Sequence, residues 1–355
     1  MATEPSKKQQ AWPIFDRIIS DRKIDGEYTN PWRGRGEGAT YTPDYEALEL
    51  LLAVPLYLKA NSQSGVPALA LDVWVAYELR RAGFDSDAVW PRDAHPRVVP
   101  SSVANLAGPK AKALIKQLRD DIWGRLGAKD SVKGVTASTA RILGKNYTKQ
   151  VDVVMSDWST GPEILISTKR MDSSFGNNAA NRVEESYGDA KNLRQRHPLS
   201  ALGFLYAIRS TVLDQKPNEN KVGWADWLID LIRKLGHEED AYHATCYLVL
   251  EWDKAVEVKE IDDTTSEVSE SDEAEDIVAV PETVIDDALR SLPAVRVRFD
   301  AMPPDLRPDV FLAAIVGRVL SNTPVELHGG ARLRRDGEYQ RKTYPSDATP
   351  SRDDE

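Results

Sequence analysis

The segment Leu199–Arg209 constrains the fold most, because it is a run of mainly apolar residues. A strand that is apolar on both faces is buried between two layers, which is typical of the parallel and mixed sheets of α/β proteins. Helices must therefore cover both faces of the sheet. Periodic apolar positions predict helices over about 44–59, 68–82, 180–196, 224–235 and 308–320.

Two short strands precede this central strand. Gln150–Met155 and Glu163–Lys169 are both rich in aliphatic residues, and the segment between them contains the turn formers Asp157 and Gly161. This pattern predicts an antiparallel hairpin. Further strands are expected at 243–252 and 295–300, so the sequence predicts an α/β fold with a mixed central β-sheet flanked by helices.

The net charge of −10 is unevenly distributed along the 355 residues. Residues 257–287 contain 13 acidic residues and one lysine, a local charge of −12 that leaves +2 for the rest of the chain. Residues 110–149 contain ten Lys or Arg and three Asp, a local +7. Because the local field governs contact with phosphate, the acidic total does not exclude a nucleic-acid partner.

Composition limits both the compartment and the metal chemistry. No run of 18 apolar residues exists and the N-terminus has no secretory signal, so we expect a cytoplasmic protein without a membrane partner. The single cysteine, Cys246, excludes a disulfide framework and a Cys-rich zinc site. Five scattered histidines argue against a His-based site, so a bound metal is expected to have oxygen ligands and to be Mg²⁺.

The predicted hairpin carries a chemical pattern. Asp152 lies inside an otherwise apolar strand, where a carboxylate without a partner or a metal is costly. Lys169 ends the next strand, and Ser167 points to the same face as Lys169. Phosphodiester hydrolysis needs a metal held by carboxylates and a positive charge beside the attacking water. The alternative is that Asp152 and Lys169 are strand-end charges that form only a salt bridge.

At these residues the chain resembles the PD-(D/E)XK, or restriction-endonuclease-like, superfamily, over about residues 68–210. In that family the first Asp and an acid two residues before the Lys bind the metal. This chain has Ser167 at the second position. Some type II restriction enzymes of the family share the S-x-K form and take the missing carboxylate from the helix after the strand.

The resemblance implies that a glutamate of the helix near 180–196 completes the metal site. Glu184 is favoured over Glu185, because a buried stripe of Val183, Tyr187 and Ala190 would place Glu184 at its edge. The alternative for both glutamates is a solvated helix face. The resemblance thus implies a catalytic set of Asp152, Lys169 and Glu184.

The family commonly has a further acid on an early helix, before a Gly-aromatic pair. Here Asp72 lies among apolar residues and precedes Gly83-Phe84. The resemblance implies that Asp72 is a second metal ligand or orients one. Glu78 is the competing residue on the same helix.

Basic residues cluster in the sequence around the proposed site. DNA contact is one interpretation, since Arg commonly recognises guanine edges and Lys and Arg bind phosphates. The other interpretation is that these charged side chains keep the protein soluble. A basic amphipathic helix predicted at 103–127 is a further phosphate-contact element. The candidate DNA-binding residues are Arg170, Arg182, Lys191, Arg194 and Arg196.

The resemblance implies a Mg²⁺-dependent DNA endonuclease, specifically a type II restriction enzyme of bacterial defence. Double-stranded DNA is its expected partner, a homodimer or higher homo-oligomer its expected assembly, and a cognate methyltransferase its expected companion. The alternatives are a catalytically silent DNA-binding or regulatory protein, and a repair or modification-dependent nuclease.

The predicted domain organisation follows from these assignments. It comprises an N-terminal arm and helical segment (1–65), a nuclease core (66–255), an acidic disordered insert (256–280), a strand–helix segment packing on the core (281–328) and a disordered tail (329–355). Residues 1–10 are expected to be a disordered arm.

Overall fold

The computed structural model describes most of the chain. The described residues are 5–112, 114–126, 135–137, 139–173, 175–217, 221–256 and 280–337. The predicted acidic insert therefore lies almost wholly outside the described residues, as does the part of the predicted tail after residue 337.

The main sheet has six strands in the order β10-β9-β8-β7-β6-β3. Its two inner pairs, β7 with β8 and β8 with β9, are parallel, and the outer pairs are antiparallel. The strands are β3 Val89–Trp90, β6 Val153–Asp157, β7 Gly161–Met171, β8 Ala201–Arg209, β9 Ala244–Trp252 and β10 Val295–Val297. The prediction of an α/β fold with a mixed sheet is confirmed.

The central strand is β8, and all nine of its residues are buried. Its parallel neighbours explain why its sequence is apolar on both faces. The predicted antiparallel hairpin is present between β6 and β7. Its first strand was wrong as a continuous element over 150–155, because the chain changes partner at Asp152, between β5 and β6. Two smaller two-stranded sheets join β1 Trp32–Arg33 to β2 Thr40–Tyr41, and β4 Ala140–Leu143 to β5 Thr148–Val151.

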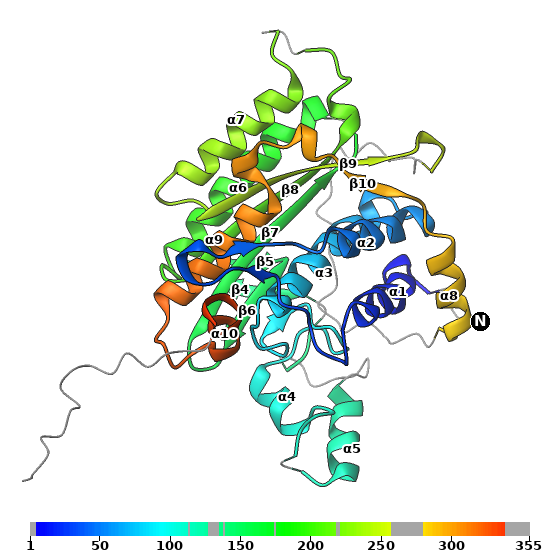
Figure 1. Ribbon diagram of the computed structural model, residues 1–355, viewed down its shortest axis with the longest axis vertical. Coiled ribbons are helices and arrows are strands. Elements are labelled where there is room, and N and C mark those ends of the chain that lie inside the picture. The colour runs from blue at the N-terminus through cyan, green and yellow to red at the C-terminus, as the bar shows by residue number, and fades with distance from the viewer. Residues whose placement is uncertain are drawn as a thin grey trace, which may run out of the picture.

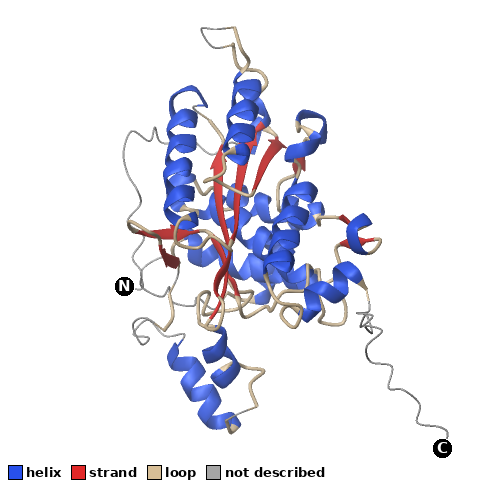
Figure 2. Ribbon diagram, turned by 90° about the vertical axis from the view of Figure 1, so that its left-hand side faces the viewer, coloured by secondary structure: helices blue, strands red, loops and turns tan. Residues whose placement is uncertain are grey.

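Helices lie on both sides of the main sheet (Figures 1 and 2). The helices are α1 Lys7–Asp21, α2 Tyr45–Tyr57, α3 Val66–Arg81, α4 Ser101–Ala107, α5 Lys116–Leu126, α6 Phe175–Arg194, α7 Trp224–His237, α8 Glu282–Arg290, α9 Pro308–Asn322 and α10 Gly329–Asp336. No helix in the described ranges has the length and apolar character that crossing a membrane requires.

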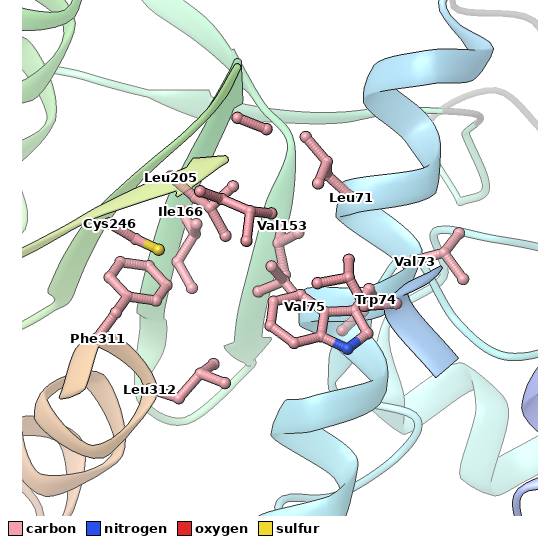
Figure 3. Close-up of a cluster of buried hydrophobic side chains, with 14 of the residues drawn as sticks. Leu71, Val73, Trp74, Val75, Val153, Ile166, Leu205, Cys246, Phe311 and Leu312 are labelled. Carbon is pink, nitrogen blue, oxygen red and sulfur yellow. The ribbon is translucent and has the colours of Figure 1, made fainter. Parts of the chain in front are cut away.

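The core between α3, α9 and one face of the sheet is closely packed (Figure 3). Gly203 in β8 allows this approach, because a Cβ there would lie 2.8 Å from the ring of Phe311 in α9. The single cysteine, Cys246, is buried in the same core, as its apolar surroundings in the sequence predict. The opposite face carries α7, where Gly236 approaches Thr245 of β9.

The N-terminal arm is helical from Lys7, so the prediction of disorder over residues 1–10 was wrong for its last four residues. Ser6 and Gln9 form a capping box: the Gln9 amide nitrogen donates to Ser6 Oγ at 3.1 Å, and the Ser6 amide donates to the Gln9 side chain at 2.8 Å. The S-x-x-Q pattern is a signal for a helix start, and it was present in the sequence.

The predicted basic helix over 103–127 was also wrong, because two helices, α4 and α5, replace it. Gly108 is extended and Pro109 follows it, which disfavours continuation of the helix. The two helices project from the body below the sheet (Figure 1). Apolar side chains that a continuous amphipathic helix would bury, such as Ile115 and Leu118, are exposed.

The chain after Gly329 forms α10, so the prediction of a disordered tail was wrong as far as Asp336. Gly83 and Gly330 approach so closely that a Cβ at Gly83 would lie 2.6 Å from the Gly330 carbonyl oxygen. Arg334 donates to the carbonyl oxygen of Arg81 at 2.7 Å. These contacts come from segments far apart in the sequence, so local patterns did not indicate them.

Candidate active site

Asp152 lies at a break between two strands. β5 ends at Val151, which pairs with β4, and β6 begins at Val153, which pairs with Ile166 of β7. This change of partner leaves Asp152 out of both ladders, and its Oδ2 accepts a hydrogen bond of 2.8 Å from the Thr168 amide. The irregularity thus directs the Asp152 carboxylate to β7, next to Lys169.

Thr168 connects two carboxylates. Its backbone amide donates to Asp152, and its hydroxyl donates to Oδ1 of Asp72, which comes from α3. Asp72 and Thr168 are both buried. Asp72 and Asp152 are far apart in sequence, one in α3 and the other at the break between β5 and β6. Both carboxylates nevertheless contact the same residue of β7, Thr168.

The two carboxylates repel each other electrostatically. Burial raises the pKa of Asp72 well above its usual value, and the negative charge of Asp152 raises it further. The hydrogen bond from Thr168 and the charges of Lys169 and Lys8 oppose this rise without cancelling it. Asp72 therefore holds a proton far more readily than an exposed aspartate, and a cation between the carboxylates would remove that preference.

Lys169 and Ser167 point to the face of β7 opposite to Thr168, since side chains alternate along a strand. Lys169 is partly exposed, while Ser167 is buried. The charge of Lys169 acts on Asp72, so the lysine lies within electrostatic range of the paired carboxylates. The structure thus brings together Asp72, Asp152 and Lys169 of the predicted set, with Ser167 beside them.

The two glutamates of α6 do not join this group. The predicted stripe of Val183, Tyr187 and Ala190 was wrong in its centre, because the buried positions include Ser186 and Leu193 whereas Tyr187 is half-buried. At 100° per residue this rotates the buried face away from Glu184. Both Glu184 and Glu185 are exposed, and Glu185 lies 3.9 Å from the guanidinium of Arg182 on the same helix.

The buried acid of α6 is Asp189, which faces the β4–β5 hairpin and was not among the predicted site residues. Its Oδ2 lies 2.6 Å from Nζ of Lys149 in β5, and its Oδ1 accepts a 3.2 Å hydrogen bond from the Tyr147 hydroxyl. The signal that would have found it is Leu193, which extends the apolar stripe one turn further and moves its centre toward Asp189.

The competing acids have structural partners. Glu78 is fully buried and accepts hydrogen bonds from Arg81, the Tyr41 hydroxyl and the Asp44 amide. Glu163 begins the predicted strand and would be expected to face water, but β7 starts at Gly161, and Glu163 is buried and contacts His328 at 2.6 Å. Both acids are therefore engaged in contacts that hold the fold together, away from the group around Asp152.

The predicted DNA-binding residues differ in their availability. Arg170 is not free to bind DNA in this structure: its side chain is 3% exposed, it pairs with Asp172 at 2.9 Å, and it lies over the Trp252 ring. Arg194 donates to the Ala241 carbonyl oxygen at 2.9 Å. The exposed residues of the predicted set are Arg182, Lys191 and Arg196.

Asp72 and Asp152 are the residues that fit a divalent cation. No group of three or more His, Cys, Asp or Glu able to hold a metal occurs among the residues that the structure describes. Mg²⁺ does not need such a group, since it is commonly bound through one or two carboxylates together with water and substrate phosphate.

Comparisons with known proteins give no independent assignment. Neither a family model, nor a curated protein, nor a solved structure matches the chain.

Proposed function

We propose that this protein is a Mg²⁺-dependent DNA endonuclease with a restriction-endonuclease-like core, and that it acts as a sequence-specific type II restriction enzyme in bacterial defence. The observation that carries the proposal is the joint contact of Asp72 and Asp152 with Thr168, directly before Lys169 in β7. A strand-end salt bridge would not require a second, buried carboxylate at the same point.

The chemistry of the donor set supports a metal at this point. Two carboxylates in mutual repulsion, one of them with a strongly raised pKa, favour either a proton or a cation between them. When bound, Mg²⁺ supplies Lewis-acid activation of the phosphate and of the attacking water. The charges of Asp72 and Asp152 match that of one divalent ion.

The remaining residues have roles that follow from their positions. Asp152 Oδ2 is held by the Thr168 amide, which fixes the orientation of the carboxylate toward a ligand. The Lys169 side chain lies on the neighbouring position of the strand and is partly exposed, so it can approach a phosphate oxygen and stabilise the charge that develops there. The hydrogen bonds of Thr168 hold the carboxylates of Asp72 and Asp152 next to each other.

The proposed partners follow from this function. The substrate is double-stranded DNA, with Arg182, Lys191 and Arg196 as exposed basic contacts. A palindromic recognition site would be cut by a homodimer or a higher homo-oligomer, in the cytoplasm and alongside a cognate methyltransferase.

A second candidate is a catalytically silent DNA-binding protein with the same fold. The observation that favours it is the absence of a third acid in the described group, since Ser167 occupies the usual position and Glu184 is exposed. A repair or modification-dependent nuclease would use the same chemistry on a different substrate.

The experiment that separates these functions is DNA cleavage by purified protein. Plasmid and unmethylated phage DNA are incubated with Mg²⁺ or with EDTA, with Asp152→Asn and Lys169→Ala as matched inactive variants. Discrete fragments that require Mg²⁺ and disappear in both variants support a restriction enzyme. Binding without any cleavage of unmodified DNA would instead identify the silent protein, and cutting restricted to modified DNA the third class.

A further inference from the structure

Lys149 is a second lysine close to the proposed centre, since the charge of Asp152 acts on it. It lies in β5, three residues before Asp152, and its Nζ contacts Asp189 at 2.6 Å. Its side chain is 30% exposed, whereas that of Asp189 is 12% exposed. The ammonium can therefore be reached by a ligand, while the carboxylate that holds it is mostly covered.

The charge of Lys149 is maintained by two carboxylates. Burial by itself would lower the pKa of Lys149, but the hydrogen bond to Asp189 and the charges of Asp189 and Asp152 raise it above its usual value. Lys149 is therefore a permanent cation near neutral pH. That property suits electrostatic contact with an anion rather than proton transfer.

Tyr242 gives an independent indication of a ligand at the same place. Its ring is 2% exposed and stacks on Phe204, with centroids 5.3 Å apart. Burial and the charges of Asp189 and Asp152 raise the pKa of its hydroxyl. The hydroxyl lies beside Ser167 but makes no hydrogen bond of regular geometry within the described ranges. A buried hydroxyl whose hydrogen-bonding capacity is not fully used is costly, which points to a water or ligand oxygen.

The position of Lys149 is fixed by the contact between the β4–β5 hairpin and α6. The Asn192 side chain of α6 accepts a hydrogen bond of 2.8 Å from the Asn146 amide and donates one of 3.0 Å to the Tyr147 carbonyl. Gly144 approaches the same side chain, since a Cβ there would lie 2.1 Å from Asn192 Nδ2. The lysine is thus oriented before any ligand binds.

We propose that Lys149 forms a second phosphate-oxygen contact of the cleavage centre, and that Asp189 is a positioning residue acting through Lys149. The ligand class is the phosphodiester oxyanion of DNA. This inference rests on the proposed nuclease function. It assigns two positive charges to the scissile phosphate, those of Lys169 on β7 and Lys149 on β5.

The test is single-turnover cleavage by the full chain. Lys149→Gln should lower the cleavage rate about 10²-fold, as expected when one electrostatic contact to the transition state is removed. Lys149→Arg, which keeps the charge, should recover most of the rate. Lys145→Gln is the matched control, because Lys145 is an exposed lysine of the same hairpin, and it should cleave like the wild type.

A second set of variants tests whether Asp189 acts through Lys149. Asp189→Asn should lower the rate about 10-fold, and the double variant Lys149→Gln/Asp189→Asn should be no slower than Lys149→Gln alone. Tyr242→Phe should lower the rate less than about 10-fold, because it removes one neutral donor. Thermal unfolding of every variant separates a loss of rate from a loss of folded protein.

The outcomes distinguish this inference from the proposed function. If the wild type cuts no DNA, both the proposed nuclease function and the role of Lys149 are contradicted. If the wild type cuts and Lys149→Gln cuts as fast as Lys145→Gln, only the inference falls. A lowered melting temperature with an unchanged rate for folded protein would show that the Lys149–Asp189 pair is purely structural.

Discussion

The helix α3 carries two buried acids with opposite surroundings. Glu78, near its C-terminal end, accepts hydrogen bonds from Arg81, Tyr41 and the Asp44 amide. Asp72, six residues earlier, contacts the Thr168 hydroxyl and faces a second carboxylate, Asp152. The chain itself neutralises the first acid with a directly bonded guanidinium, whereas the hydrogen bond that holds the second comes from a neutral hydroxyl.

Their pKa values express the same difference. Burial raises the pKa of Glu78, but the charge of Arg81 and the hydrogen bonds that Glu78 accepts limit this pKa to about 7. Burial and the charge of Asp152 raise the pKa of Asp72 well above its usual value. The comparison teaches that burial alone does not single out a candidate functional acid, and that the lack of a directly bonded counter-charge is what distinguishes Asp72 from Glu78.

The largest expected effect on stability is at Glu78. Glu78→Ala would leave the Arg81 guanidinium buried without its partner, and we expect the free energy of unfolding to fall by about 3–5 kcal/mol. Urea denaturation measures this change. The matched control is Glu46→Ala, an exposed acid paired with Arg22, which should change stability by less than about 1 kcal/mol. If Glu78→Ala changed stability as little as Glu46→Ala does, the contrast between Glu78 and Asp72 would not hold.

The next largest effect is on catalysis at Asp72. Asp72→Asn should lower the rate of Mg²⁺-dependent cleavage about 10²–10³-fold, because one of the two proposed metal ligands loses its charge. Cleavage assays at saturating DNA measure the loss, and calorimetry measures the weaker binding of Mg²⁺. Asp214→Asn, at an exposed position, serves as the control. Normal cleavage by Asp72→Asn would exclude Asp72 from the metal site.

The same variant should have a smaller, pH-dependent effect on stability. Because the pKa of Asp72 is raised on folding, the folded protein holds an extra proton above the unfolded pKa of about 3.9. The wild type therefore loses stability as the pH rises from there through the folded pKa. The amide introduced by Asp72→Asn does not ionise, so the variant should be more stable than the wild type at pH 8, by on the order of 1 kcal/mol.

Thermal unfolding in EDTA at pH 4, 6 and 8 measures this difference, which should shrink toward zero at pH 4. Mg²⁺ should then stabilise the wild type more than the variant at pH 8. A wild type that is more stable than Asp72→Asn at pH 8 without metal would contradict the assigned electrostatics.

The smallest expected effect is on α6. Glu184→Ala and Glu185→Ala should each change the cleavage rate less than about threefold, since surface charges contribute little. Rate measurements on both variants decide between the sequence-based assignment and the geometry. Loss of cleavage in Glu184→Ala would mean that α6 rotates when DNA binds, and it would restore Glu184 as the third ligand.

Much of the fold followed from local patterns. The apolar run of β8, the β6–β7 hairpin and the periodicity of α2, α3, α7 and α9 were all predicted, because each depends on its own residues. The capping box at Ser6 was a local signal too, although the prediction of a disordered arm overlooked it. The hairpin β4–β5 and helix α10 were not predicted, since their stability comes from α6 and from Gly83.

The sequence by itself determined the strand position of Lys169 and singled out Asp72 as an odd charge in an apolar helix, but it placed Asp152 inside a strand, whereas the structure has a break there. Only the tertiary structure decided that Asp72 meets Asp152 at Thr168, while Glu78 meets Arg81. It also decided that Asp189, rather than Glu184, is buried, against the β4–β5 hairpin. The physical reason is that the spacing of residues in the sequence fixes only the relative directions of side chains within one helix or strand. Which buried charge is neutralised, and by which partner, depends on how the helices and strands pack against each other.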